Sequence, residues 1–216
     1  MTREMYLKEI KNHILRQEEG TMYIPSDFLD MANVNAVNKA LSRLASEGTI
    51  RRILQGVYEY PKYSSFLKEY VSPSPEKIAK AIARKNNWKI IPYKDVALNI
   101  LGLSTQVPST YIYASDGVTK TYELADEYNN LKIIFKKTPQ RDITGISEKA
   151  ALIIQAQKAK GKDNIDDRFL RKISMSLTPE EKHIILSETQ NSTSWIYENI
   201  KKMINVRDYE ENCNIT

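Results

Sequence analysis

The fold of the N-terminal half is decided by residues 25–61, which read PSDFLDMANVNAVNKALSRLASEGTIRRILQGVYEYP. Ser26 is a good N-cap residue and predicts a short helix over residues 27–31. A longer helix begins at Asn33 or Asn35. Its apolar residues recur at i, i+3, i+4, i+7 and i+8, which places them on one stripe facing a core. They are Val37, Ala40, Leu41, Leu44 and Ala45.

A two-stranded ribbon is expected directly after this helix. Gly48 lies where a glycine commonly ends a helix, and residues 49–54 and 57–60 are β-prone runs around a Gln55-Gly56 turn. Upstream, apolar residues at helical spacing predict a first helix over about 5–18. The order of helix, short helix, longer helix and ribbon is that of a winged helix-turn-helix, in which the longer helix enters a DNA groove.

The clearest break between structural elements in the sequence is Ser72-Pro73-Ser74-Pro75, which follows a linker-like stretch starting at Lys62. Pro75 suits the first turn of a helix that runs to about Lys85. We therefore expect a winged helix-turn-helix domain at residues 1–70 and a second domain at residues 71–216.

The second domain reads as a mixed α/β body. Strands are expected over residues 110–114, 119–124 and 131–136, and the pattern turns helical after about residue 147. The polar tail from about 205 to 216 is expected to be frayed. The predicted fold class is α/β (α+β), with an N-terminal winged helix-turn-helix and a helical C-terminal end.

Composition limits the classes of protein that the chain can belong to. Of its 216 residues 41% are hydrophobic and 27% charged, which is typical of a globular protein. No apolar run approaches the roughly 20 residues that span a bilayer, and the first residues lack a signal core, so we expect a cytoplasmic protein without a membrane partner. The single cysteine, Cys213, excludes an intramolecular disulfide.

Net charge alone does not indicate a nucleic-acid partner. The chain carries +5, which suits a polyanion, but residues 1–70 hold 10 Lys and Arg against 9 Asp and Glu, a net charge of only +1. Any DNA contact must therefore come from a local cluster. The outer face of the longer helix offers Asn, Lys, Ser and Arg, the side chains that reach base edges and phosphates. A solvated helix face would have the same composition, and the order of the surrounding elements is what favours DNA.

The candidate DNA-contact residues lie on that helix and on the ribbon. Because side chains alternate across a strand, only one of Arg51 and Arg52 can face the core, and the other is expected to meet phosphate. The full set is Asn35, Asn38, Lys39, Ser42, Arg43, Arg51, Arg52, Gln55 and Gly56.

Catalytic and metal-binding patterns are absent from the sequence. His13 and His183 are the only histidines, and neither lies in a metal-binding spacing. The acidic pairs Asp166-Asp167 and Glu180-Glu181 have the ligand type that Mg²⁺ prefers, but each falls at a helix start, where acidic residues favour the helix dipole. We expect no enzymatic activity, no cofactor, no metal site and no small-molecule substrate.

The chain resembles the AbiEi-type antitoxins of bacterial abortive-infection, type IV toxin-antitoxin systems. The matching segments are YIPSDFLD (23–30), VNAVNKALSRLASEGTIRRILQGVYEYP (34–61) and PSPEKIAKAIARKNNWKIIPYKDVALNILGLSTQVPSTYIYASDG (73–117). The resemblance covers about residues 20–137. It implies a transcriptional autorepressor that binds inverted repeats in double-stranded DNA of its own promoter through the N-terminal domain. It also implies that the C-terminal domain counteracts a nucleotidyltransferase-like toxin, by direct contact or by opposing the effect of the toxin.

Two other classes stay open at this point. The chain can be a protein-interaction module whose winged helix no longer binds DNA, which the near-neutral charge of residues 1–70 favours. It can also be a nuclease or nucleotidyltransferase that uses Asp166 and Asp167, which would require clustered carboxylates.

Overall fold

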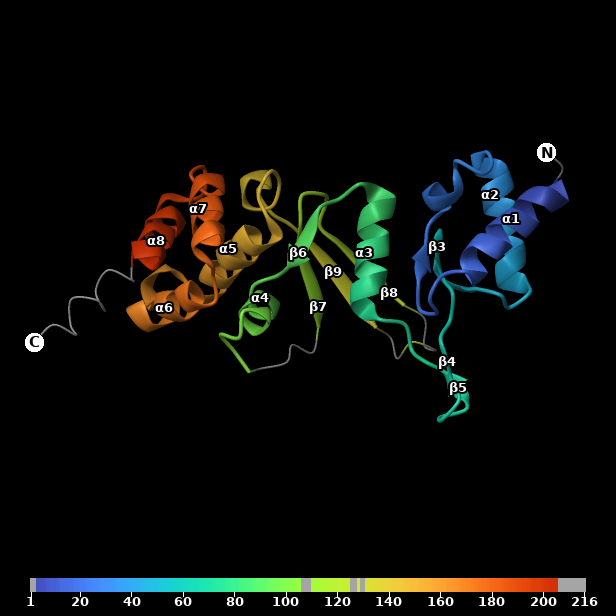
Figure 1. The fold of residues 1–216 in the computed structure, drawn as a ribbon, viewed down its shortest axis with the longest axis horizontal. Coiled ribbons are helices and arrows are strands. Elements are labelled where there is room, and N and C mark those ends of the chain that lie inside the picture. Colours follow the sequence, from blue (N-terminus) through green and yellow to red (C-terminus); the bar gives the residue numbers. More distant parts are fainter. Residues whose placement is uncertain (1–2, 106–109, 125–127, 129–130, 206–216) are drawn as a thin grey trace, which may run out of the picture. The chain divides into compact units, whose positions relative to one another are not determined.

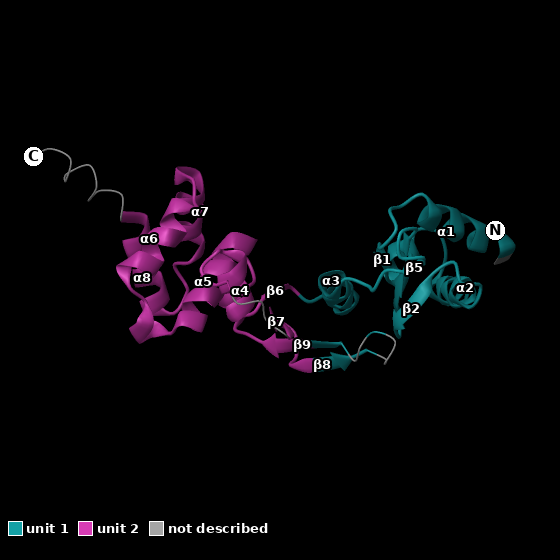
Figure 2. Ribbon diagram, turned by 90° about the horizontal axis from the view of Figure 1, so that it is seen from below, with its two compact units in different colours: residues 1–88, 121–133 teal, residues 89–120, 134–216 magenta. Residues whose placement is uncertain are grey.

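The chain is a mixed α/β protein made of two compact units. A computed structural model describes residues 3–105, 110–124, 128 and 131–205, in the order of elements shown in Figure 1. The first unit comprises residues 1–88 and 121–133, and the second comprises residues 89–120 and 134–216 (Figure 2). The predicted fold class is confirmed. The expected frayed tail from residue 206 onward, with Cys213, lies outside the described residues.

The first unit opens with α1 (Arg3–Leu15), β1 (Met22–Tyr23), the 3-10 helix η1 (Pro25–Phe28) and α2 (Val34–Ser46). Asn33 is the N-cap of α2, and its side-chain oxygen accepts a hydrogen bond from the backbone N–H of Ala36 at 3.0 Å. The short helix expected over residues 27–31 is instead a 3-10 turn over residues 25–28. Pro25 fixes its first position, and the Asp27 carboxylate accepts the N–H of Ile24 at 2.9 Å.

A three-stranded antiparallel sheet follows the helices, in the order β1-β3-β2. Its hairpin consists of β2 (Arg51–Leu54) and β3 (Val57–Glu59), with Arg51 opposite Glu59 and Arg52 opposite Tyr58. This completes a winged helix-turn-helix, in which the β2-β3 hairpin is the wing. The apolar stripe of α2 packs with Ile10, Ile14 and Phe28 into one core. His13 packs edge-on against the Phe28 ring with the ring centroids 5.6 Å apart, so this histidine is a packing residue.

The stretch after the wing is an ordered hairpin rather than a linker. Strands β4 (Tyr63–Ser64) and β5 (Glu69–Tyr70) pair antiparallel, with Tyr63 opposite Tyr70. Helix α3 (Pro75–Asn86) begins at the proline that the sequence indicated, and the side chain of Ser74 caps it. Because α3 contacts β1 and β3, it belongs to the first unit. The division after residue 88 therefore differs from the boundary expected at residues 70–71.

After residue 88 the chain forms a sheet and a short helix, of which residues 121–123 of β8 and 132–133 of β9 are counted in the first unit. The elements are β6 (Ile90–Pro92), α4 (Asp95–Ile100), β7 (Tyr111–Ser115), β8 (Lys120–Glu123) and β9 (Lys132–Lys137). The four strands form one sheet in the order β6-β7-β9-β8, with β6 and β7 antiparallel. The three strands expected from the sequence are thus all present, each within one residue of its predicted ends.

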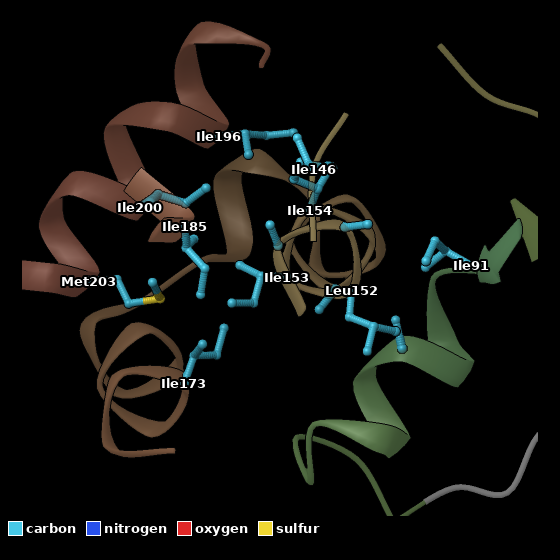
Figure 3. Close-up of a cluster of buried hydrophobic side chains, with 14 of the residues drawn as sticks. Ile91, Ile146, Leu152, Ile153, Ile154, Ile173, Ile185, Ile196, Ile200 and Met203 are labelled. Atoms are coloured by element: carbon cyan, nitrogen blue, oxygen red, sulfur yellow. The ribbon is translucent and has the colours of Figure 1, made fainter. Parts of the chain in front are cut away.

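The rest of the second unit is helical, as expected. Its elements are η3 (Gln140–Asp142), α5 (Glu148–Lys160), η4 (Lys162–Asn164), α6 (Asp167–Met175), α7 (Pro179–Glu188) and α8 (Ser194–Asn205). Helix α5 is central: residues 150–157 are all buried, and Ile153 and Ile154 contribute to the apolar cluster shown in Figure 3. None of the helices in the described part of the chain has the length and apolar character needed to cross a bilayer.

Burial on all sides of α5 leaves two amide groups inside the second unit. The side chains of Gln155 and Gln157 are fully buried, and their amide nitrogen and oxygen atoms have no hydrogen-bond partner among the described residues. A buried polar group without a partner costs about 1–3 kcal/mol of folding free energy. These two positions therefore lower the stability of the helical end.

We expect Gln155→Met and Gln157→Met each to raise the free energy of unfolding by about 1 kcal/mol, because methionine keeps the side-chain length and removes the unpaired polar atoms. Urea unfolding followed by circular dichroism measures the change. Glu148→Gln, on the same helix but at its exposed first position, is the control and should change little. A loss of stability in both methionine variants would contradict the reading of these amides as unpaired.

Candidate nucleic-acid interface

The exposed face of α2 gathers the predicted contact residues of that helix. Val37, Leu41 and Leu44 point into the core and are fully buried. The 3.6-residue repeat then turns the intervening polar positions outward. The exposed candidates are Asn35, Asn38, Lys39, Ser42 and Arg43. The structure thus places all five predicted helix residues on one accessible surface, with hydrogen-bond donors and acceptors of the types that read base edges.

Few of these side chains are engaged within the protein. Neither Lys39 nor the amides of Asn35 and Asn38 make a side-chain hydrogen bond or ion pair with the rest of the described chain. The Arg43 guanidinium pairs with Glu47 at 2.8 Å, one turn further along the helix. Both partners are exposed, so this pair stabilises the helix by only a few tenths of a kcal/mol and can exchange for a phosphate.

A groove of about 260 Å³ lies beside this face, between α1 and α2. The residues that line it are Tyr6, Leu7, Asn33, Asn35, Ala36, Lys39, Ala40 and Arg43. Three of them are candidate contact residues. The surface is therefore concave, with an apolar floor and a polar, cationic rim, rather than a convex helix side.

Arg51, at the start of the wing, is held inside the protein. Its guanidinium donates to the Glu59 carboxylate directly across the ribbon, and also to the backbone oxygen of Val71 at 2.5 Å. The same group lies 5.8 Å from the centre of the Tyr128 ring. Arg51 thus joins three segments of the first unit, and its charge is balanced within the protein by the Glu59 carboxylate.

Glu59 is the buried partner of this pair, with a side chain only 3% exposed. Burial raises the pKa of the Glu59 carboxyl, and the hydrogen bond and charge of Arg51 act against that rise. A buried carboxylate that loses its cation is costly, because nothing then offsets its desolvation. Arg51 is accordingly a structural residue of the wing.

Arg52 is the arginine of the pair that faces solvent. Its guanidinium lies 5.6 Å from the centre of the Tyr58 ring and 3.4 Å from the Tyr58 hydroxyl, and it has no ion-pair partner in the described part of the chain. Tyr58 itself is buried in the core of the first unit. The expected alternation is therefore present, with Arg52 as the solvent-exposed member of the pair.

The tip of the wing is supported by α3. The Lys85 ammonium donates to the backbone oxygen of Gln55 at 2.5 Å, and it would lie 3.2 Å from a Cβ atom placed on Gly56. Gly56 has φ +72°, so the turn needs glycine for its backbone as well as for this close approach. The Gln55 side chain is exposed and the Gly56 backbone is partly covered.

The acidic pairs serve helix starts, as expected from their positions. Asp166 caps α6 by accepting the N–H of Phe169 at 2.7 Å, and Glu181 forms a capping box with Thr178. A hydrogen bond from Lys149 lowers the pKa of the Glu181 carboxyl. No group of three or more His, Cys, Asp or Glu suited to a metal occurs in the residues that the structure describes.

The sequence of the chain fits one family model over residues 9–185, that of a family of unknown function designated DUF6088. The chain belongs to the DUF6088 family. The searches of curated proteins and of solved structures found no match. The matched range of the DUF6088 model includes the winged helix from the middle of α1 onward, α3 and most of the second unit.

Three basic residues of α3 were not among the predicted site residues of this DUF6088 protein. Lys77 donates to the backbone oxygen of Gly20 at 3.0 Å, and Arg84 donates to that of Met22 at 3.0 Å and to both oxygens of Asp27 at 3.1 and 3.2 Å. With Lys85 on the wing tip, α3 is bonded to the chain before β1, to the start of the helix-turn-helix and to the wing. No local sequence signal reveals contacts between residues 57 positions apart.

We expect Arg51→Ala to destabilise the protein by about 3–5 kcal/mol near neutral pH, because it leaves the Glu59 carboxylate buried without its cation. Arg51→Ala/Glu59→Gln should recover most of that loss. Denaturant unfolding of the two variants and the wild type gives the comparison. Equal destabilisation in the single and double variants would contradict the pairing.

The same carboxyl predicts a pH dependence. A raised folded-state pKa means that the folded protein holds the Glu59 proton more tightly than the unfolded chain does, so stability from this group is lost as pH rises above 4.5, its ordinary value. Glu59→Gln removes that titration. The stability of this variant relative to wild type should therefore increase between about pH 4 and pH 7, and an unchanged difference across this range would count against it.

Proposed function

We propose that this protein binds double-stranded DNA through the exposed face of α2 and represses transcription of its own operon. The observation that carries the proposal is the single accessible surface formed by Asn35, Asn38, Lys39, Ser42 and Arg43, on the longer helix of a winged helix-turn-helix. In that fold the corresponding helix lies in the major groove. Arg and Asn then pair with base edges, and Lys and Ser hold the phosphates.

The wing adds a smaller contact to this surface in our proposal. Arg52 is exposed and has no ion-pair partner in the described residues, so it is the wing cation that meets a phosphate. Gln55 and Gly56 form the wing tip and allow a close backbone approach. Arg51 was predicted as a contact residue, but we assign it to the support of the wing because it is bonded to Glu59 and Val71.

The basic residues of α3 change the net charge of the region that is proposed to bind DNA. Residues 1–88 hold 14 Lys and Arg against 10 Asp and Glu, a net charge of +4, compared with +1 for residues 1–70. Residues 121–133 add one Lys against three Asp and Glu, so the whole first unit holds 15 Lys and Arg against 13 Asp and Glu, a net charge of +2. Net charge therefore does not decide between DNA and the alternative of a protein-interaction module whose winged helix has lost DNA binding, and the proposal rests on the exposed side chains of α2 and the wing.

The antitoxin part of the proposal rests on the resemblance to AbiEi-type antitoxins. In this reading the protein binds inverted repeats in its own promoter, and its second unit counteracts a nucleotidyltransferase-like toxin encoded in the same operon. Co-expression tests this part separately from DNA binding. The protein should restore growth of cells that express the adjacent gene, and a lack of rescue would overturn the antitoxin role while leaving the repressor role standing.

We expect Arg43→Ala to weaken binding to a duplex from the region upstream of the gene by about 5- to 150-fold, the loss of about 1–3 kcal/mol that a base-contacting side chain supplies. Lys39→Ala and Arg52→Ala should weaken binding to all duplexes alike and reduce the salt dependence by about one unit each. Fluorescence anisotropy titrations over a series of salt concentrations measure both quantities.

Arg168→Ala is a matched control, because it removes an exposed arginine from α6 in the second unit. Its affinity and salt dependence should equal those of wild type. Two results would contradict the assignment of α2 as the DNA-reading helix. One is unchanged affinity in Arg43→Ala at moderate salt, and the other is an equal loss of affinity in Arg168→Ala and Arg43→Ala. Wild-type protein that retains no duplex at low salt would favour the protein-interaction module.

A further inference from the structure

The β4-β5 hairpin exposes more apolar surface than any other part of the first unit. Phe66, in the turn between the strands, is 91% exposed, and four neighbouring apolar side chains are 38–59% exposed. These four are Tyr63, Leu67, Tyr70 and Val71. A contiguous apolar patch on an otherwise polar surface marks a contact site rather than a random feature of composition.

The hairpin is a built projection, fixed at its base (Figure 1). The N–H of Val71 donates to the oxygen of Lys62 at 2.8 Å, and Arg51 donates to the oxygen of Val71, so the end of the hairpin is bonded to the wing. Tyr63 and Tyr70 face each other across the strands in a T-shaped pair with the ring centroids 5.4 Å apart. At the turn, the Ser64 hydroxyl accepts the N–H of Leu67 at 3.2 Å. The apolar tip is therefore presented on a defined ribbon.

Charge at the hairpin favours a nucleic acid over a second protein. Lys62 at its base and Lys68 beside its tip are exposed, and neither has an ion-pair partner in the described residues. Glu69 lies opposite Ser64, and because side chains alternate along a strand, it is on the other face from the tyrosine pair. At the base, the Glu19 carboxylate accepts the N–H of Tyr63 at 3.3 Å. The tip itself, residues 65–68, carries one cation and no carboxylate, as a side chain that enters a groove between two phosphate backbones requires.

The small size of the patch also favours a nucleic acid over a second protein. A two-stranded ribbon is an element that DNA-binding proteins place in the major or the minor groove. A stable protein interface commonly takes about 20–30 residues from each partner, far more than this hairpin contains. Architectural proteins insert Phe and Leu side chains from the minor groove between base steps, and thereby bend the duplex.

We propose that the β4-β5 hairpin is a second DNA contact, in which Phe66 and Leu67 wedge between base steps from the minor groove and Lys62 and Lys68 hold the flanking phosphates. This inference rests on the proposed function, because it places the hairpin on the same duplex that α2 reads. It adds that the bound duplex is bent, and that part of the specificity comes from how easily the DNA sequence deforms.

The test uses the full chain and a duplex of about 40 base pairs, roughly four helical turns, from immediately upstream of the gene, with a fluorescence donor and acceptor at its two ends. Wild-type binding should raise energy transfer, because bending brings the ends together. Phe66→Ser/Leu67→Ser should weaken binding about tenfold, the loss expected when aromatic contact with bases is removed, and should abolish the rise in energy transfer. Phe66 is almost fully exposed, so circular dichroism of this variant should match wild type.

Two comparisons make the result specific. Met175→Ser removes another strongly exposed apolar side chain, 80% exposed at the end of α6, and should leave affinity and energy transfer unchanged. Arg43→Ala should lower affinity, while the complex that still forms at high protein concentration keeps the bend. Affinity and energy transfer thus distinguish the contribution of the hairpin from that of α2.

Wild-type affinity and wild-type energy transfer in Phe66→Ser/Leu67→Ser would overturn the wedge and leave the DNA-binding proposal intact. A wild-type dimer that this variant converts to a monomer, seen by sedimentation without DNA, would also overturn it and assign the patch to a second copy of the chain. Absence of duplex binding by wild-type protein would overturn the proposed function, and the wedge with it.

Discussion

The buried ion pair between Arg51 and Glu59 is the interaction on which the first unit depends. It crosses the wing ribbon at its root, and the same guanidinium reaches the end of the β4-β5 hairpin through Val71. Desolvating two charges costs several kcal/mol, and their attraction compensates for this only when the remaining donors find partners. Arg51 meets that condition because its guanidinium has a carboxylate and a carbonyl oxygen as acceptors. The wing and the hairpin are therefore fixed together.

Helix α3 extends the same principle along the rest of the unit. Its cations are bonded to backbone oxygens before β1 and at the wing tip, and its Arg84 holds the Asp27 carboxylate that starts the helix-turn-helix. Each bond is partly exposed and weak alone. Together they restrain the elements on either side of α2 in the sequence, so α3, which lies outside the winged helix, helps to set the orientation of the wing relative to α2.

How much of this was accessible from the sequence depends on the range of the interactions involved. The α2 stripe, its asparagine cap and the proline start of α3 are local signals, and the structure has them where the sequence indicated. The alternation of strand side chains showed that one of Arg51 and Arg52 is buried, but only Glu59 across the ribbon decides which. The hairpin was missed because its strands are two residues each and Lys68 takes a left-handed conformation at the turn. The bonds of α3 join residues up to 62 positions apart and leave no local pattern.

The distribution of paired and unpaired cations carries more information about function than their number. Arg51, Lys77, Arg84 and Lys85 are each bonded to an oxygen of the protein, so they count toward the net charge of the first unit but are already engaged within it. Lys39, Arg52, Lys62 and Lys68 are exposed and form no ion pair in the described residues. These four lie on α2, the wing and the hairpin. Other cations of the first unit, such as Lys8 and Arg16, are also exposed and form no ion pair in the described residues. Lys39 and Arg52 differ from them in lying beside the polar side chains of α2 and of the wing, where the proposed contact with DNA is made.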